Sequence, residues 1–88
     1  MDMDTTETRV AVMSIIVEQP ESVPALNEYL HEYGEYIIGR MGIPYRERGI
    51  SIISIALDAP QEKISALSGK IGRLSGVGVK TVCSSFGQ

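Results

Sequence analysis

Residues 36–58, YIIGRMGIPYRERGISIISIALD, decide the fold of this chain. Two apolar runs, Tyr36–Ile43 and Ile50–Leu57, flank a short charged turn, Pro44–Gly49. Both runs are rich in isoleucine and are bounded by turn residues, which is typical of two strands joined as a hairpin. Two glycines interrupt the first run, and glycine inside a strand indicates a bulge or a curled edge strand. We therefore expect a hairpin whose first strand lies at the edge of a sheet.

The segment before the hairpin predicts a strand followed by a helix. Arg9–Val17 is rich in β-branched residues and is apolar on both of its faces, which is typical of a strand buried on both sides. Pro20–Tyr33 then changes period and places apolar residues at helical spacing. We expect Ser22 to be the N-cap of this helix, because serine oxygens accept hydrogen bonds from the first free N–H groups.

The segment after the hairpin predicts a second helix and a last strand, Val77–Cys83. We expect Asp58 to cap this helix and Pro60 to occupy its first turn. Its apolar stripe consists of Ile64, Leu67, Ile71 and Leu74. A flank of small residues, which permits close packing, consists of Ser65, Ser68, Gly69 and Gly72. Acidic residues surround the first helix and basic residues the second, so the two helices should attract each other modestly.

The element order is therefore βαββαβ, the order of a ferredoxin-like plait. We predict an α+β, ferredoxin-like fold with an antiparallel four-stranded sheet and two helices on one face. We expect the first and third strands to be central and to run parallel to each other. Because both of these strands are apolar on both faces, helices on one face leave the other face uncovered. Such a surface is larger than monomers usually expose, so we predict a homo-oligomer, a dimer or a tetramer.

The length of 88 residues fits one domain, which we place at residues 9–84. We expect residues 1–8 to be a disordered acidic leader and residues 85–88 to be a frayed end. The leader has neither the basic region nor the apolar core of a signal peptide, and no apolar run approaches the ~20 residues of a membrane span. We therefore predict a cytoplasmic protein that does not engage a membrane.

Composition argues against two classes of function. The chain has 8 basic and 11 acidic residues and a net charge of −3, so it lacks the basic stripe of a nucleic-acid-binding protein. Residues 1–8 are too short and too acidic to serve as a DNA-binding segment. No paired catalytic carboxylates, nucleophile elbow or metalloprotease helix is present in the sequence, so we predict that the chain is not an enzyme.

The charged turn is the best candidate for a recognition surface. It contains Tyr45, Arg46, Glu47 and Arg48, and Arg40 precedes it in the same hairpin. Guanidinium groups bind carboxylates and phosphates through two hydrogen bonds, and a tyrosine hydroxyl can orient a planar ligand. The alternative is a solvated hairpin tip or a contact between protomers. The sequence does not identify a cofactor.

One histidine and one cysteine offer little for metal binding. Zinc takes four ligands, or three and a water molecule, so His31 and Cys83 do not make a site within one chain. We predict no metal site, and an intersubunit site through these two residues is the only metal hypothesis that the sequence leaves open. Otherwise His31 is a surface residue, and Cys83 is a small apolar residue at the end of the last strand.

Several motifs in the chain resemble one protein family. HEYG at residues 31–34, YIIGRMGIPYRERG at 36–49, SIIS at 51–54, LDAP at 57–60 and ISALSGK at 64–70 are similar to the iron-only hydrogenase system regulators. The match covers about residues 9–82. That family is similar in fold to ACT-type regulatory domains and to the C-terminal sensor domain of the nickel-responsive repressor. The resemblance implies a small oligomeric module associated with hydrogenase or related metabolism.

Three functional hypotheses follow from the residues and the resemblance. The first is a regulatory, ligand-sensing module that binds a small-molecule effector near the charged turn and controls transcription only through a partner. The second is a structural interaction subunit that holds another protein through its sheet edge or helices. The third is a metal-responsive sensor with an intersubunit site.

Overall fold

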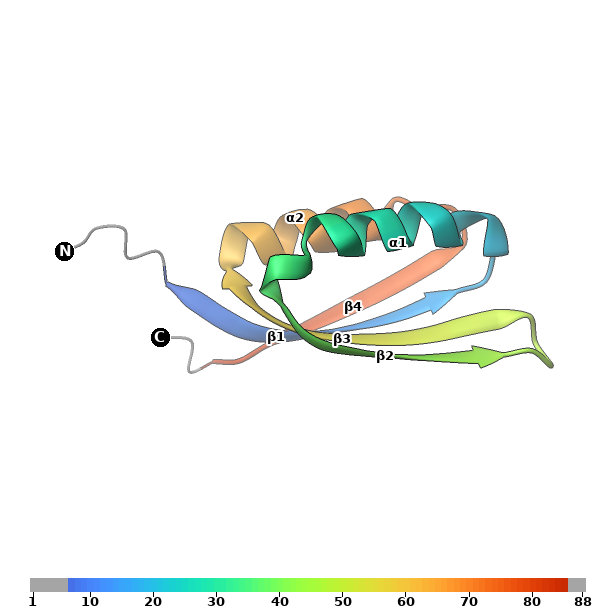
Figure 1. Ribbon diagram of the computed structural model, residues 1–88, viewed down its shortest axis with the longest axis horizontal. Helices are drawn as coiled ribbons and strands as arrows, with labels where there is room; N and C mark the ends of the chain where they lie inside the picture. The colour runs from blue at the N-terminus through green and yellow to red at the C-terminus, as the bar shows by residue number, and fades with distance from the viewer. Residues whose placement is uncertain (1–6, 86–88) are drawn as a thin grey trace.

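Four strands form one antiparallel sheet in the order β2-β3-β1-β4 in the computed structural model, which describes residues 7–85. The elements are β1 Thr8–Val17, η1 Pro20–Ser22, α1 Val23–Glu32, η2 Gly34–Tyr36, β2 Ile37–Tyr45, β3 Ile50–Pro60, α2 Gln61–Gly72 and β4 Val77–Cys83. Figure 1 shows α1 and α2 side by side over one face of the sheet, with the opposite face bare. The predicted ferredoxin-like βαββαβ plait is confirmed. The predicted leader, residues 1–8, and the predicted frayed end, residues 85–88, lie outside the described residues except for Glu7, Thr8 and Ser85, and Thr8 is the first residue of β1 rather than part of a leader.

The central strands are β1 and β3, as the sequence predicted, but they do not run parallel. They pair antiparallel from Thr8 opposite Pro60 to Val17 opposite Ser51. The expectation of parallel strands is wrong because β2 and β3 form a hairpin, and a hairpin reverses the chain direction. The crossover through α1 brings β2 back parallel to β1, so β3 must be antiparallel to it.

Two boundaries differ from those that the sequence predicted. β2 continues through Tyr45, and Pro44 is tolerated there because an edge strand needs no N–H on its outer side. β3 continues to Pro60, so Asp58 pairs with Val10 and does not cap α2. The extension occurs because β1 begins at Thr8 and offers hydrogen-bonding partners along the whole of β3.

Ser22 stands at the N-cap position of α1, but its side chain makes no capping hydrogen bond. Its hydroxyl instead donates to the carbonyl oxygen of Ser75 at 2.7 Å. That bond joins the start of α1 to the loop between α2 and β4. The predicted capping role is therefore wrong, because this long-range acceptor takes the hydroxyl.

The glycines of β2 have the effect that the sequence indicated. The register of β2 against β3 shifts between Ile37 and Gly39, which is a bulge, and β2 is an edge strand. A bulge increases the local twist of a strand, and Figure 1 shows the hairpin curving away beneath the helices.

The core lies between the helices and one face of the sheet. Every second residue of β1 and β3 is buried there, while the alternate residues point to the opposite face. The buried apolar residues are Ala11, Met13, Ile15, Val17, Leu26, Leu30, Tyr33, Ile53, Ile55, Leu57, Ala59, Ile64, Leu67 and Ile71. One face of each central strand is therefore covered within the protomer, and the apolar residues of the other face are not.

The two helices attract each other through Lys70 of α2. Its ammonium lies 3.5 Å from the Glu32 carboxylate and 5.2 Å and 5.6 Å from the ring centroids of Tyr33 and Tyr29. The pKa of Lys70 is raised above its ordinary value of 10.5, chiefly by a hydrogen bond with the Tyr33 side chain; partial desolvation opposes the shift, and the charge of Glu32 adds to it. The predicted attraction between the helices is thus present in this contact.

We expect Lys70→Met to lower the thermal unfolding midpoint slightly at neutral pH. A raised pKa in the folded state stabilises the protein fully below the ordinary value and loses that effect as pH rises through the raised pKa. The midpoints of the wild type and the variant should therefore converge at strongly alkaline pH in thermal scans followed by circular dichroism. A gap that stays constant across that range would mean that the packing of the lysine stem, and not its charge, stabilises the fold.

Candidate functional site

The uncovered side of the sheet, called the open face below, carries a continuous set of apolar side chains. Cross-strand partners place Ile43, Ile52 and Ile16 in one row, and Ala56, Val12 and Val82 in another. Their exposed fractions range from 39% at Ile52 to 70% at Val82 for the large side chains. The open face comprises Val10, Val12, Ser14, Ile16, Gly39, Met41, Ile43, Tyr45, Ile50, Ile52, Ser54, Ala56, Asp58, Gly78, Lys80 and Val82.

The open face is hollowed beside one of its glycines and is almost free of charge. Gly78 adds no side chain opposite Ile16, and a shallow, mostly apolar depression of about 310 Å³ lies there. Asp58 on β3 and Lys80 on β4 are its charged members, and they have opposite signs. Burial of this surface would therefore require few charges to be desolvated.

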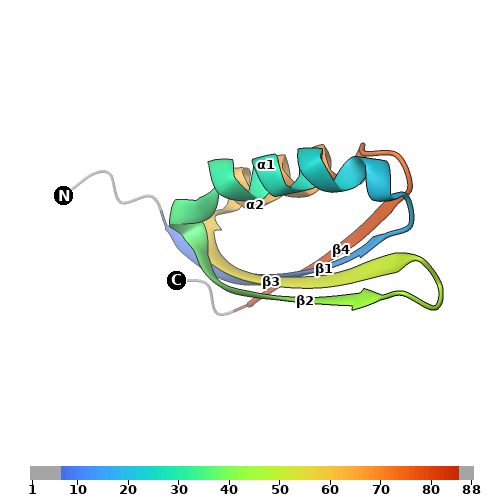
Figure 2. The same cartoon turned by 45° about the vertical axis from the view of Figure 1, so that its right-hand side comes forward.

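The charged turn lies at the tip of the β2–β3 hairpin, at the end of the sheet that Figure 2 shows farthest from the chain termini. The Tyr45 hydroxyl donates to Oε1 of Glu47 at 3.0 Å, and both side chains are exposed. Arg46 and Arg48 occupy the turn itself and are exposed as well. The turn is thus a tyrosine–glutamate pair flanked by two exposed guanidinium groups.

Arg40 lies apart from the other four predicted site residues. It pairs with Ile55, whose side chain is in the core, so Arg40 faces the helices, whereas Tyr45 pairs with Ile50 on the other side of the strand. One guanidinium nitrogen of Arg40 donates to Oδ1 of Asn27 on α1 at 3.5 Å. The fold therefore brings Tyr45, Arg46, Glu47 and Arg48 together and places Arg40 elsewhere.

The two candidate metal ligands lie on different elements. His31 is exposed on α1, and Cys83 is half-buried at the end of β4. Within residues 7–85, no three His, Cys, Asp or Glu side chains are grouped so as to hold a metal ion. A site shared between protomers stays a hypothesis.

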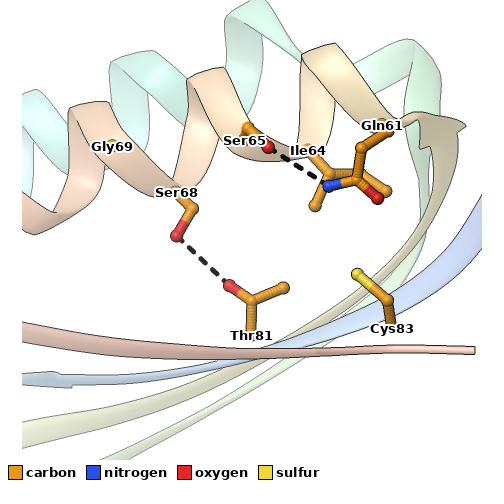
Figure 3. Close-up of a pocket in the computed structure, with 7 residues that line it drawn as sticks. All are labelled: Gln61, Ile64, Ser65, Ser68, Gly69, Thr81 and Cys83. Carbon is orange, nitrogen blue, oxygen red and sulfur yellow. Dashed lines mark hydrogen bonds between the residues drawn. The ribbon is translucent and has the colours of Figure 1, made fainter.

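A second candidate site lies between α2 and β4 and is called the α2–β4 cavity below. It has a volume of about 430 Å³, and Figure 3 shows the Cys83 sulfur pointing from β4 toward α2 across it. Nε2 of Gln61 donates to Oγ of Ser65 at 3.1 Å, and the hydroxyls of Thr81 and Ser68 are 3.2 Å apart. The lining residues are Gln61, Ile64, Ser65, Ser68, Gly69, Thr81 and Cys83.

The sequence did not reveal this cavity. From the sequence, we expected the small residues of α2 to permit close packing. This is true of Gly72, because an added Cβ there would lie 3.4 Å from Cγ1 of Val79. Ser65, Ser68 and Gly69 instead leave space against β4. The available signal was three small or polar residues in succession along one helix face, but the strand opposite that face follows only from the tertiary fold.

Arg9 lies beside the lining residue Gln61, at the end of the cavity nearest the start of α2. Its guanidinium donates to Oε1 of Gln61 at 2.7 Å and, through two nitrogens, to the carbonyl oxygen of Ser84 at 2.7 Å and 3.2 Å. These bonds fix the Gln61 amide and join β1, α2 and the end of β4.

Within residues 7–85, no helix is long and apolar enough to cross a membrane.

Comparison with known proteins identifies the family. A family model described as "TM1266-like: Iron-only hydrogenase system regulator, putative" matches residues 9–81, which confirms the resemblance found in the sequence. The structure of the uncharacterized protein TM1266 from Thermotoga maritima superposes with a TM-score of 0.84 at 41% identity, covering 88% of this chain and 98% of that one. Two proteins that share sequence and structure over this extent share a fold.

More distant relatives match in sequence or in fold alone. A protein named "Putative nickel-responsive regulator" from Saccharolobus solfataricus is 28% identical over 84% of this chain and 55% of its own length. The chain therefore spans about half the length of the curated relatives that it matches. The C-terminal domain of the MgtC protein from Mycobacterium tuberculosis has a TM-score of 0.69 at 13% identity, covering 99% and 98% of the two chains, which shows a common fold only. The family match and the likeness to TM1266 together decide the assignment, and the chain belongs to the TM1266-like family of iron-only hydrogenase system regulators.

Proposed function

We propose that this chain is the assembly and effector-sensing module of a regulator of the iron-only hydrogenase system and that it acts as a homo-oligomer. The observation that carries the proposal is the open face, where apolar residues of all four strands stand exposed. A monomer rarely exposes an apolar surface of this extent, and such surfaces mark sites of association. A domain of this length also gains stability by burying more apolar area.

The occupant of the open face is a second copy of the chain. Its charged residues, Asp58 and Lys80, are opposite in sign. A two-fold axis lying between two stacked sheets can place each aspartate against the lysine of the other copy, and it forms both pairs at once. A surface that is complementary to itself in this way favours a two-fold dimer over an unrelated partner.

The charged turn is the second part of the proposal. The two arginines at the hairpin tip are exposed, and they are suited to a carboxylate or a phosphate. They would hold an acidic group of an effector or of the neighbouring protomer. Control of transcription would pass through a partner, because the residues of the fold carry no basic stripe.

Sedimentation equilibrium of the wild-type protein, from low to high micromolar concentration, tests the assembly. We expect the mass of a dimer or a tetramer and a dissociation constant in the micromolar range or below, as a small but well-packed interface gives. A mass that stays at one chain throughout would contradict the proposal. If an Arg46→Ala, Arg48→Ala double variant keeps both the oligomer and the affinity for effectors, the charged turn has no part in the proposed function.

A further inference from the structure

The α2–β4 cavity is large enough and open enough to take a small molecule. Its volume of about 430 Å³ falls in the range of roughly 300–1,000 Å³ that ligand sites occupy. One wall is a single face of α2, and the other is β4, an edge strand of the sheet. It lies beside an open edge of the sheet, and its residues are not members of the open face.

The cavity presents hydrogen-bond donors that the protein does not use. Oγ of Ser65 already accepts a bond from Gln61, and its own hydroxyl proton has no acceptor within residues 7–85. Ser68 and Thr81 share one hydrogen bond between two hydroxyls, so one of their two protons also lacks an acceptor in the described chain. Two hydroxyl protons are thus available to a ligand that carries acceptor atoms.

Gly69 leaves part of the wall open at a cost to the helix. Glycine is a poorer helix former than alanine in a helix interior, so a glycine there lowers the stability of the helix. No steric reason requires it here, because an added Cβ would meet only a guanidinium nitrogen of Arg73 at 3.6 Å, an ordinary contact. Its φ angle is not in the left-handed region either. The missing side chain keeps space free in the cavity.

The lining excludes charge. None of the seven lining residues is Asp, Glu, Lys, Arg or His, and the neighbouring Arg9 is engaged by Gln61 and by the carbonyl oxygen of Ser84. No residue of the lining would pair with a carboxylate or an ammonium that lost its water here, and the Arg9 and Arg73 guanidinium groups flank the cavity from outside that lining. The side chain of Ile64 adds an apolar surface to the wall. The ligand should therefore be neutral, partly apolar and rich in acceptors.

We propose that the α2–β4 cavity binds a small neutral molecule through a carbonyl or ring-nitrogen acceptor, which accepts hydrogen bonds from Ser65 and from the Ser68–Thr81 pair. Cys83 and Ile64 contact its apolar part. This proposal rests on the proposed sensing function and gives that function a site separate from the assembly surface.

Nicotinamide and nicotinate are a matched pair of probes, because they differ in one group, a neutral amide against a carboxylate. We expect nicotinamide to shift the amide resonances of α2 and β4 in a saturable way in ¹⁵N-resolved NMR spectra of the intact chain. Nicotinate should bind at least about tenfold more weakly, which corresponds to about 1.4 kcal/mol. Equal affinity for the two probes, or no saturable shift with nicotinamide, would overturn the proposal.

Two substitutions in α2 localise the effect. Gly69→Leu places a side chain in the cavity, and we expect it to abolish the nicotinamide shifts; Ala66→Leu adds the same bulk on the exposed side of the helix and should not change them. Gly69→Leu favours helix formation, and leucine is nearly as good a helix former as the alanine that it replaces at position 66, so both proteins should fold. Binding that survives Gly69→Leu would overturn the proposed site. Sedimentation of the same variant reports on assembly separately, so a failure of the cavity and a failure of the oligomer can be told apart.

Discussion

Replacing Ile16 with glutamate should leave the protein monomeric at concentrations at which the wild type is associated. Ile16 lies on central strand β1, in the row that joins Ile43 and Ile52, and it is 46% exposed in the protomer. In a face-to-face dimer its side chain would be buried near the middle of the interface. A carboxylate there would lose its water, and Lys80, which lines the same depression, is already paired with Asp58 of the other copy in the proposed dimer.

The expected loss of binding free energy can be taken from substitutions at the centre of other protein interfaces. Changes at such positions commonly cost about 2 kcal/mol or more, which raises a dissociation constant by roughly 30-fold. Sedimentation velocity at one fixed concentration would detect this as a shift from the associated to the monomeric mass. The circular dichroism spectrum should stay unchanged, because Ile16 points away from the core.

Ala66→Glu is the matched control for this variant. It introduces the same charge at an exposed position of α2, on the helix side of the molecule. We expect it to sediment like the wild type. If both variants stay associated, the protomers meet at a sheet edge or through the helices, and the open face does not mediate the assembly.

The fold could be predicted from the sequence because strand-like apolar runs alternate clearly with segments of helical apolar spacing. The two-sided apolar pattern of Arg9–Val17 and Ile50–Leu57 also predicted that one sheet face would lack cover, and the structure leaves that face bare. The hydrophobic pattern could not predict where β3 ends. Asp58 and Pro60 resemble a helix start locally, and the pairing with β1, which begins at Thr8, extends the strand through them.

The candidate sites depend on spatial relations that a linear pattern only partly contains. Arg40 and Tyr45 are five positions apart in one strand, so alternation alone predicts that they face opposite sides, as they do. Proximity in the sequence concealed that separation. The α2–β4 cavity is the reverse case, since Ser68 and Thr81 belong to elements whose contact is set by the packing of α2 on the sheet.

Gly76→Ala should destabilise the fold strongly, by about 2–5 kcal/mol. Gly76 has a φ of +67°, a conformation that costs other residues roughly 1–2 kcal/mol. A Cβ at this position would lie 2.5 Å from Cγ and 2.9 Å from Cβ of Gln19, so one of the two loops would have to move. The Gly76 carbonyl accepts a hydrogen bond from the Glu18 N–H at 2.7 Å, which holds the loops together and resists that movement. Overpacking of this kind adds about 1–3 kcal/mol.

Gly49→Ala separates these two causes. Gly49 has the same φ of +67°, but nothing lies within 4 Å of an added Cβ, so this variant measures the conformational cost alone. We expect urea denaturation to give a loss of about 1–2 kcal/mol for Gly49→Ala and a clearly larger loss for Gly76→Ala. Equal losses would mean that the Gln19 side chain moves aside freely. A larger loss at Gly76 would mean that the close contact between the β1–α1 and α2–β4 loops is a rigid part of the fold.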